Sequence, residues 1–70
     1  MSEEETAIIS FLGEFGEAFV GRREIARKAV KRQIFEENPH WADAALSGLT
    51  DRGTVEQNDS GHYRIKRYQR

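Results

Sequence analysis

The chain has 70 residues, no cysteine, 33% charged residues and a formal net charge of −1. This length allows one small domain, and the lack of cysteine excludes disulfides and thiolate metal sites. No apolar run approaches the roughly 20 residues of a membrane span, and the acidic start is unlike a signal peptide. We therefore expect a single cytoplasmic domain over residues 1–70 that does not associate with membranes.

A first helix is predicted from the start of the chain. Ser2 and Glu5 have the spacing of a capping box, and the acidic first turn suits the helix dipole. Gly16 is expected to end this helix in a left-handed conformation, before a short extended segment at residues 18–20. The apolar residues recur at three- and four-residue steps, which is typical of a helix with one buried face: Ile8, Phe11, Leu12, Phe15 and Phe19.

A second helix is expected to begin near Gly21 or Arg22 and to end by Glu37, because the residue before Pro39 avoids helical geometry. Its inward face would carry Ile25, Ala26, Ala29, Val30 and Gln33. Its outward face would carry two rows of cations at four-residue spacing, Arg23–Arg27–Lys31 and Lys28–Arg32. Such rows either stay solvated or are available to bind an anion.

The last helix is predicted to begin with Asn38 as its N-cap and Pro39 in its first turn, and to stop at Gly53. A hairpin follows, with strands at 54–58 and 62–67 around a turn at 59–61. The expected core combines the apolar faces of all these elements: Ile8, Phe11, Leu12, Phe15, Phe19, Ile25, Ala29, Leu46, Leu49, Val55, Tyr63 and Ile65.

The segment 45–55 (ALSGLTDRGTV) and the hairpin after it resemble the second half of a winged helix-turn-helix domain. Residues 11–16 (FLGEFG), 18–20 (AFV) and 23–26 (REIA) resemble its first half. The resemblance implies an α+β fold with three helices and a C-terminal β-hairpin wing, in the order helix, strand, helix, helix, strand, strand. Residues 30–38 depart from the family because they are longer than its usual turn, so either the second helix is extended or a small insertion lies there.

The resemblance implies binding of double-stranded DNA by a transcription-regulator-like protein, with the last helix in the major groove and the wing on the backbone. The helix positions that would face bases are His40, Asp43, Ala44, Ser47 and Trp41, and the wing contacts would be Arg64, Lys66 and Arg67. Base reading favours Arg, Lys, Asn and Gln, which this outward face lacks, and Asp43 and Asp51 would repel phosphate.

Phosphate contacts supply affinity without reading sequence. A track of cations for this purpose is predicted from the second helix, the end of the last helix and the wing: Arg23, Arg27, Lys28, Lys31, Arg52, Arg64 and Lys66. A solvated face paired with the acidic segments 1–21 and 36–51 explains the same charges about equally well. Winged helices also form homodimers that pair half-sites.

The alternative function is a winged helix that binds proteins and not DNA. Trp41, Ala44 and Gly48 would then form a flat, weakly charged surface that a partner approaches closely. The two functions differ in one respect: DNA binding needs the cations to share a face that Asp43 and Asp51 do not shield.

Other chemistry has little support in the sequence. His40 and His62 lack the spacing of a metal site, so we expect neither a metal nor a cofactor. The serines lack a nucleophile elbow, and we expect no enzymatic activity. Trp41 is more simply explained as an indole at the edge of the core that seals the last helix against the second helix or Phe35.

Overall fold

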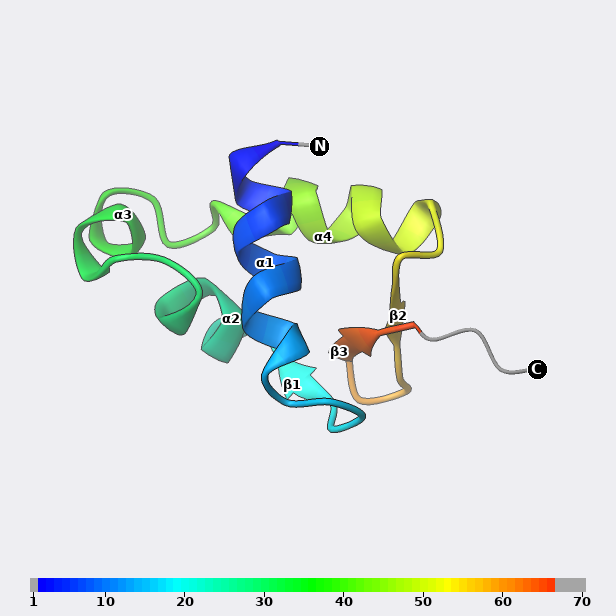
Figure 1. Cartoon of the computed structure of the whole chain (residues 1–70). Coiled ribbons are helices and arrows are strands. Elements are labelled where there is room, and N and C mark those ends of the chain that lie inside the picture. Colours follow the sequence, from blue (N-terminus) through cyan, green and yellow to red (C-terminus); the bar gives the residue numbers. More distant parts are fainter. Residues whose placement is uncertain (1, 67–70) are drawn as a thin grey trace.

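The computed structural model describes residues 2–66, which form four helices and a three-stranded antiparallel sheet (Figure 1). The predicted α+β class is confirmed, but the prediction of three helices is wrong, because residues 30–38 contain a short helix of their own. None of the helices in the described part of the chain is long and apolar enough to cross a membrane. The elements in chain order are α1 (Glu3–Gly13), β1 (Val20–Gly21), α2 (Arg22–Lys28), α3 (Arg32–Glu37), α4 (Ala42–Asp51), β2 (Val55–Gln57) and β3 (His62–Ile65).

The start of α1 confirms the predicted capping box. The Glu5 amide donates to Ser2 Oγ and the Ser2 amide donates to Glu5 Oε1, both at 3.1 Å. The helix ends at Gly13 and not at Gly16, because the next amide, of Glu14, bonds the carbonyl of Phe11 three residues back. Gly16 does adopt the expected positive φ, of 61°. It therefore reverses the chain just beyond the helix.

The second helix is short, which corrects the predicted rows of cations. α2 ends at Lys28, so Lys31 and Arg32 lie beyond it and do not continue a row with Arg23 and Arg27. In a longer helix the carbonyl of Ala26 would accept a bond from the amide four residues later. Here it accepts a bond of 2.8 Å from the indole of Trp41. The second helix is therefore not extended through residues 30–38, which hold the separate helix α3 (Arg32–Glu37).

The start of the last helix also differs from the prediction. α4 begins at Ala42, and Pro39 lies in the turn before it. Asn38 does not cap α4, because its Oδ1 accepts from the His40 amide at 3.2 Å and its carbonyl accepts from the Trp41 amide at 3.1 Å. Asn38 therefore stabilises the turn between α3 and α4.

The predicted stop at Gly53 is confirmed in detail. Gly53 has a φ of 78° and donates its amide to the Thr50 carbonyl, while Thr54 donates to the Leu49 carbonyl. These two bonds are those of a Schellman motif, which satisfies the last carbonyls of a helix. The chain leaves α4 directly into β2.

The three strands are arranged in the order β1-β3-β2. Val20 pairs with Tyr63 on one side of β3, and Val55 pairs with Ile65 on the other. The expected extended segment at 18–20 is thus a strand shifted to Val20–Gly21. The hairpin turn is organised by Asn58, whose Oδ1 accepts from the amides of Ser60 and His62.

The core lies between α1, α4, α2 and the inner face of the sheet. Phe15 is 43% exposed, so its predicted core position is wrong, and Phe19 also lies outside the core. Because side chains alternate along an extended chain, Val20 points into the core and Phe19 points away from it, and this explains why Val20 is buried in place of Phe19. Phe11, Ala29 and Ile65 pack against the core while half-buried. The buried residues of the core are Ile8, Leu12, Val20, Ile25, Ala26, Ala42, Leu46, Leu49, Val55 and Tyr63.

Candidate functional site

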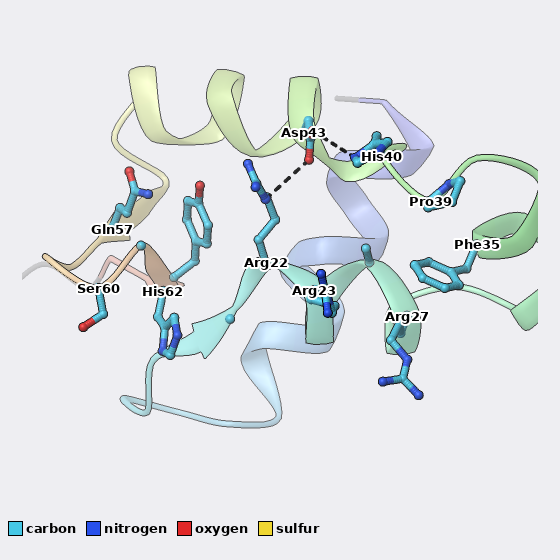
Figure 2. Close-up of a pocket in the computed structure, with 14 residues that line it drawn as sticks. Arg22, Arg23, Arg27, Phe35, Pro39, His40, Asp43, Gln57, Ser60 and His62 are labelled. Carbon is cyan, nitrogen blue, oxygen red and sulfur yellow. Dashed lines mark ion pairs between the residues drawn. The ribbon is translucent and has the colours of Figure 1, made fainter.

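A groove of about 950 Å³ lies where α2, the turn between α3 and α4, and the tip of the hairpin come together (Figure 2). Its walls come from segments far apart in the sequence. The residues that line it are Gly21, Arg22, Arg23, Ala26, Arg27, Phe35, Pro39, His40, Asp43, Gln57, Ser60, Gly61, His62 and Tyr63.

The sheet brings the hairpin to the start of α2. Gly21 pairs with His62 at the end of β1, and Arg22 begins α2 at the next position. A Cβ atom on Gly21 would lie 3.5 Å from Nε2 of His62, so the imidazole rests directly against the strand. The two-residue strand β1 therefore sets the distance between the arginines of α2 and the hairpin.

Three of the four Arg, Lys, Asp and Glu side chains that line the groove are arginines. Arg22, Arg23 and Arg27 come from α2, and two histidines lie at the groove's edges. The one acidic side chain among the described residues lining it is Asp43, whose carboxylate lies 3.7 Å from Nε of Arg22 and 3.6 Å from Nδ1 of His40.

Arg23 and Arg27 are exposed and form no ion pair with any other described residue. Asp43 neutralises part of the charge near Arg22 but leaves these two guanidinium groups uncompensated. The groove can therefore bind an anion at Arg23 and Arg27.

The other cations of the predicted track lie elsewhere. Lys28 pairs with Glu24 at 3.0 Å, and Arg52 pairs with Glu5 across α1 and α4. Lys31 is exposed on the connection between α2 and α3. None of these three lysine and arginine side chains lines the groove. Only Arg23 and Arg27 of the predicted track are brought together there.

Arg64, predicted as a wing contact, is held within the molecule. Its guanidinium lies 4.3 Å from the centre of the Phe19 ring, donates to the Glu17 carbonyl at 3.1 Å, and pairs with Glu56 at 3.4 Å. Lys66 is exposed outside the groove. Arg67, the last predicted wing contact, lies outside the described residues.

The predicted base-reading face of α4 is only partly at the groove. His40 and Asp43 line it, while Ala44, Ser47 and Asp51 do not. Asp51 lies at the far end of α4, so it does not shield the groove arginines.

The residues of the alternative protein-binding surface are mostly engaged internally. Trp41 donates its indole N–H to Ala26, which confirms the expectation that it seals the last helix against the second. A Cβ atom on Gly48 would lie 3.3 Å from the Glu5 carboxylate, so this glycine gives α1 a close approach to α4. Ala44 is the exposed member of the three.

Several lining residues were not assigned to a nucleic-acid site from the sequence, and three of them matter for the chemistry of the groove: Arg22, Phe35 and His62. Arg22 was expected only as a helix start, although its place in a run of two arginines after a glycine was a usable signal. Phe35 and His62 reach the groove through α3 and through strand pairing, and no local pattern indicates either. Within residues 2–66, no group of three or more His, Asp or Glu side chains could hold a metal ion.

Comparison with known proteins gives this chain no relative: no family model, no curated protein and no solved structure matches it significantly.

Proposed function

We propose that this chain is a winged helix-turn-helix domain that binds double-stranded DNA through its phosphate backbone. The order of elements supports the fold, with α1, α2 and α4 as the three helices of the family, α3 as an insertion, and β2–β3 as the wing. The pairing of β1 with β3 joins the wing to the helices as such a domain requires.

The observation that carries the proposal is the gathering of three arginines and two histidines in one groove. Guanidinium groups bind phosphate oxygens in bidentate geometry and stay charged at all physiological pH values. Arg23 and Arg27 have no carboxylate partner among the described residues, so binding a phosphate breaks no ion pair of theirs.

The proposed binding depends on phosphate contacts more than on reading bases. The exposed face of α4 offers Ala44, Ser47 and Asp51, which lack the donors that recognise base edges in the major groove. Such a protein binds many sequences with similar affinity, and its affinity falls steeply with salt as counterions are released. The homodimer that the resemblance implies stays a prediction.

The alternative, a winged helix that binds only proteins, has weaker support. Trp41 and Gly48 are both used for contacts within the molecule, so the flat surface predicted from them is largely occupied. The groove, in contrast, leaves Arg23 and Arg27 available to an external ligand.

The test is fluorescence anisotropy of a labelled duplex of random sequence, titrated with the protein over a series of salt concentrations. We expect binding that weakens as salt rises, with a slope that reports the number of phosphates contacted. A double variant, Arg23→Gln with Arg27→Gln, should reduce that slope by about two, one for each phosphate contact removed.

The matched control is the double variant Lys28→Gln with Arg32→Gln. It removes the same number of charges from the neighbouring helices but outside the groove, where both cations are paired with glutamates. It should leave the slope nearly unchanged. Equal losses in the two double variants would show only a general effect of net charge, and absence of binding at low salt would refute the proposal.

A further inference from the structure

The two ends of the groove differ in chemistry. One end, at the hairpin tip, is polar and includes His62 and Ser60. The other end, where α3 turns into α4, has an apolar wall made by Phe35 and Pro39 (Figure 2). Arg27 lies between them in the same view, next to the apolar wall.

A regular duplex does not account for the apolar wall. Its surface presents phosphates and sugars to a protein that stays outside the grooves, while the faces of its bases are stacked inside. A phenyl ring offers a phosphate neither a positive charge nor a hydrogen-bond donor. Phe35 is only half-buried, so part of its side chain packs against the core and part remains in the groove.

An unstacked base has the complementary chemistry. Proteins that bind single strands combine a cationic path for the backbone with aromatic side chains on which bases stack, and this stacking tolerates any base. In the groove, Arg27 and Arg23 supply the cations and Phe35 supplies the ring, all three within one continuous surface.

We infer that the groove receives an unpaired nucleotide, at a single-stranded overhang of a DNA duplex, with its phosphate at Arg23 and Arg27 and its base against Phe35 and Pro39. The inference rests on the proposed function and makes it more specific, because it names the end of a duplex as the preferred ligand. The rest of the duplex then continues past the β2–β3 hairpin of the protein, over the polar end of the groove.

The test compares two DNA stem-loops whose stems have the same sequence. One stem has a blunt end, and the other carries a short single-stranded overhang that contains 2-aminopurine. Binding to both is measured by competition at fixed salt. We expect the overhang to bind about tenfold more tightly, the effect of stacking one base. We also expect the fluorescence of the aminopurine to change on binding, since stacking on a ring alters its emission.

The variant Phe35→Leu keeps an apolar side chain against the core but removes the ring. It should bind both DNAs with the affinity that the native protein has for the blunt one, and should not change the aminopurine emission. The control is Ile34→Ala, which removes an exposed apolar side chain from the same helix outside the groove and should keep the preference. Thermal unfolding of each variant confirms that it is folded.

The outcomes separate this inference from the proposed function. Equal affinity of the native protein for blunt and overhanging DNA, with no change in aminopurine emission, overturns the inference and leaves duplex binding intact. Loss of the preference in Ile34→Ala as well as in Phe35→Leu also overturns it. Absence of binding to either DNA at low salt overturns both proposals. The emission of the aminopurine with native protein gives a result even if Phe35→Leu does not fold.

Discussion

The indole N–H of Trp41 donates a hydrogen bond of 2.8 Å to the backbone carbonyl of Ala26. That carbonyl belongs to the last turn of α2, where helical amides are no longer available to satisfy it. Trp41, the residue just before α4, thus joins α4 to the last turn of α2, at a residue, Ala26, that lines the groove.

The variant Trp41→Phe should lower the free energy of unfolding by about 2 kcal/mol, because it leaves a carbonyl without a partner and removes part of the packing of the indole. The measurement is urea unfolding followed by circular dichroism, since the variant loses the protein's one tryptophan fluorophore. An unchanged unfolding midpoint would show that water satisfies the Ala26 carbonyl equally well.

The pair of Glu5 and Arg52 should make stability depend on pH. The hydrogen bond from Arg52, together with the bond from the Ser2 amide, lowers the pKa of Glu5 below its usual 4.5. A carboxyl with a lowered pKa stabilises the fold above its unfolded pKa, and this contribution is lost as the pH falls through the folded value. Unfolding free energy should therefore decline below about pH 4.5.

Urea unfolding between pH 7 and pH 3 tests this relationship. The variant Glu5→Gln should show a smaller decline over the acidic range than the native protein, because it has no proton to gain there. The control is Glu3→Gln, which removes an exposed carboxylate from the same turn and leaves the pair intact. If Glu5→Gln and the native protein decline in parallel, the pair does not contribute to acid sensitivity.

Gly53→Ala should destabilise the protein by about 1–2 kcal/mol, because the positive φ of 78° disfavours any residue with a Cβ atom. No other atom lies within 4 Å of the added methyl group, so the cost comes from the backbone alone. Gly53→Asn, which tolerates this conformation better, should cost less. Thermal unfolding of the two variants measures the order, and a more stable Gly53→Ala would contradict it.

Gly13→Ala should have the opposite sign, a gain of about 0.5 kcal/mol, because Gly13 is helical and alanine favours a helix over glycine. Its added Cβ would meet the Ile65 side chain at 3.9 Å, which is ordinary contact. The same unfolding experiment compares both glycines. A destabilised Gly13→Ala would mean that the packing of α1 against β3 leaves no room for a methyl group between Gly13 and Ile65.

Arg64→Ala should lower the unfolding free energy by about 1 kcal/mol while changing DNA affinity little. The guanidinium covers the Phe19 ring and bonds the Glu17 carbonyl, so its removal affects the fold more than the groove. Anisotropy with duplex DNA and urea unfolding are measured on the same variant. If Arg64→Ala lost as much affinity as the double variant Arg23→Gln with Arg27→Gln, the result would show that Arg64 contacts the DNA.

The sequence predicted the features that depend on residues close together in the chain. The Ser2–Glu5 capping box, the left-handed conformation at Gly16, the helix stop at Gly53 and the hairpin follow from local hydrogen bonds and backbone preferences, and all of them are observed. The inward face of α4 was also predicted, since helical periodicity over ten residues leaves little choice.

Predictions failed where a distant residue decided the outcome. The predicted cation rows needed a long second helix, but α2 ends at Lys28, and the carbonyl of Ala26 accepts a hydrogen bond from Trp41, fifteen residues further along the chain. The misplacement of Phe15 and Phe19 has a local cause by contrast, because α1 ends at Gly13, where the Glu14 amide bonds the Phe11 carbonyl, and Val20 and not Phe19 is buried in the core.

The sequence by itself therefore determined the class of the fold, the turns at Gly16, at Gly53 and in the hairpin, and the segregation of its charges. Only the tertiary structure decided which charges meet. Strand pairing between Gly21 and His62 brings the hairpin against Arg22, and α3 brings Phe35 to the same groove. Three segments, at residues 21–27, 35–43 and 57–63, come together there because they share a core to bury, and no local preference of any of them encodes that contact.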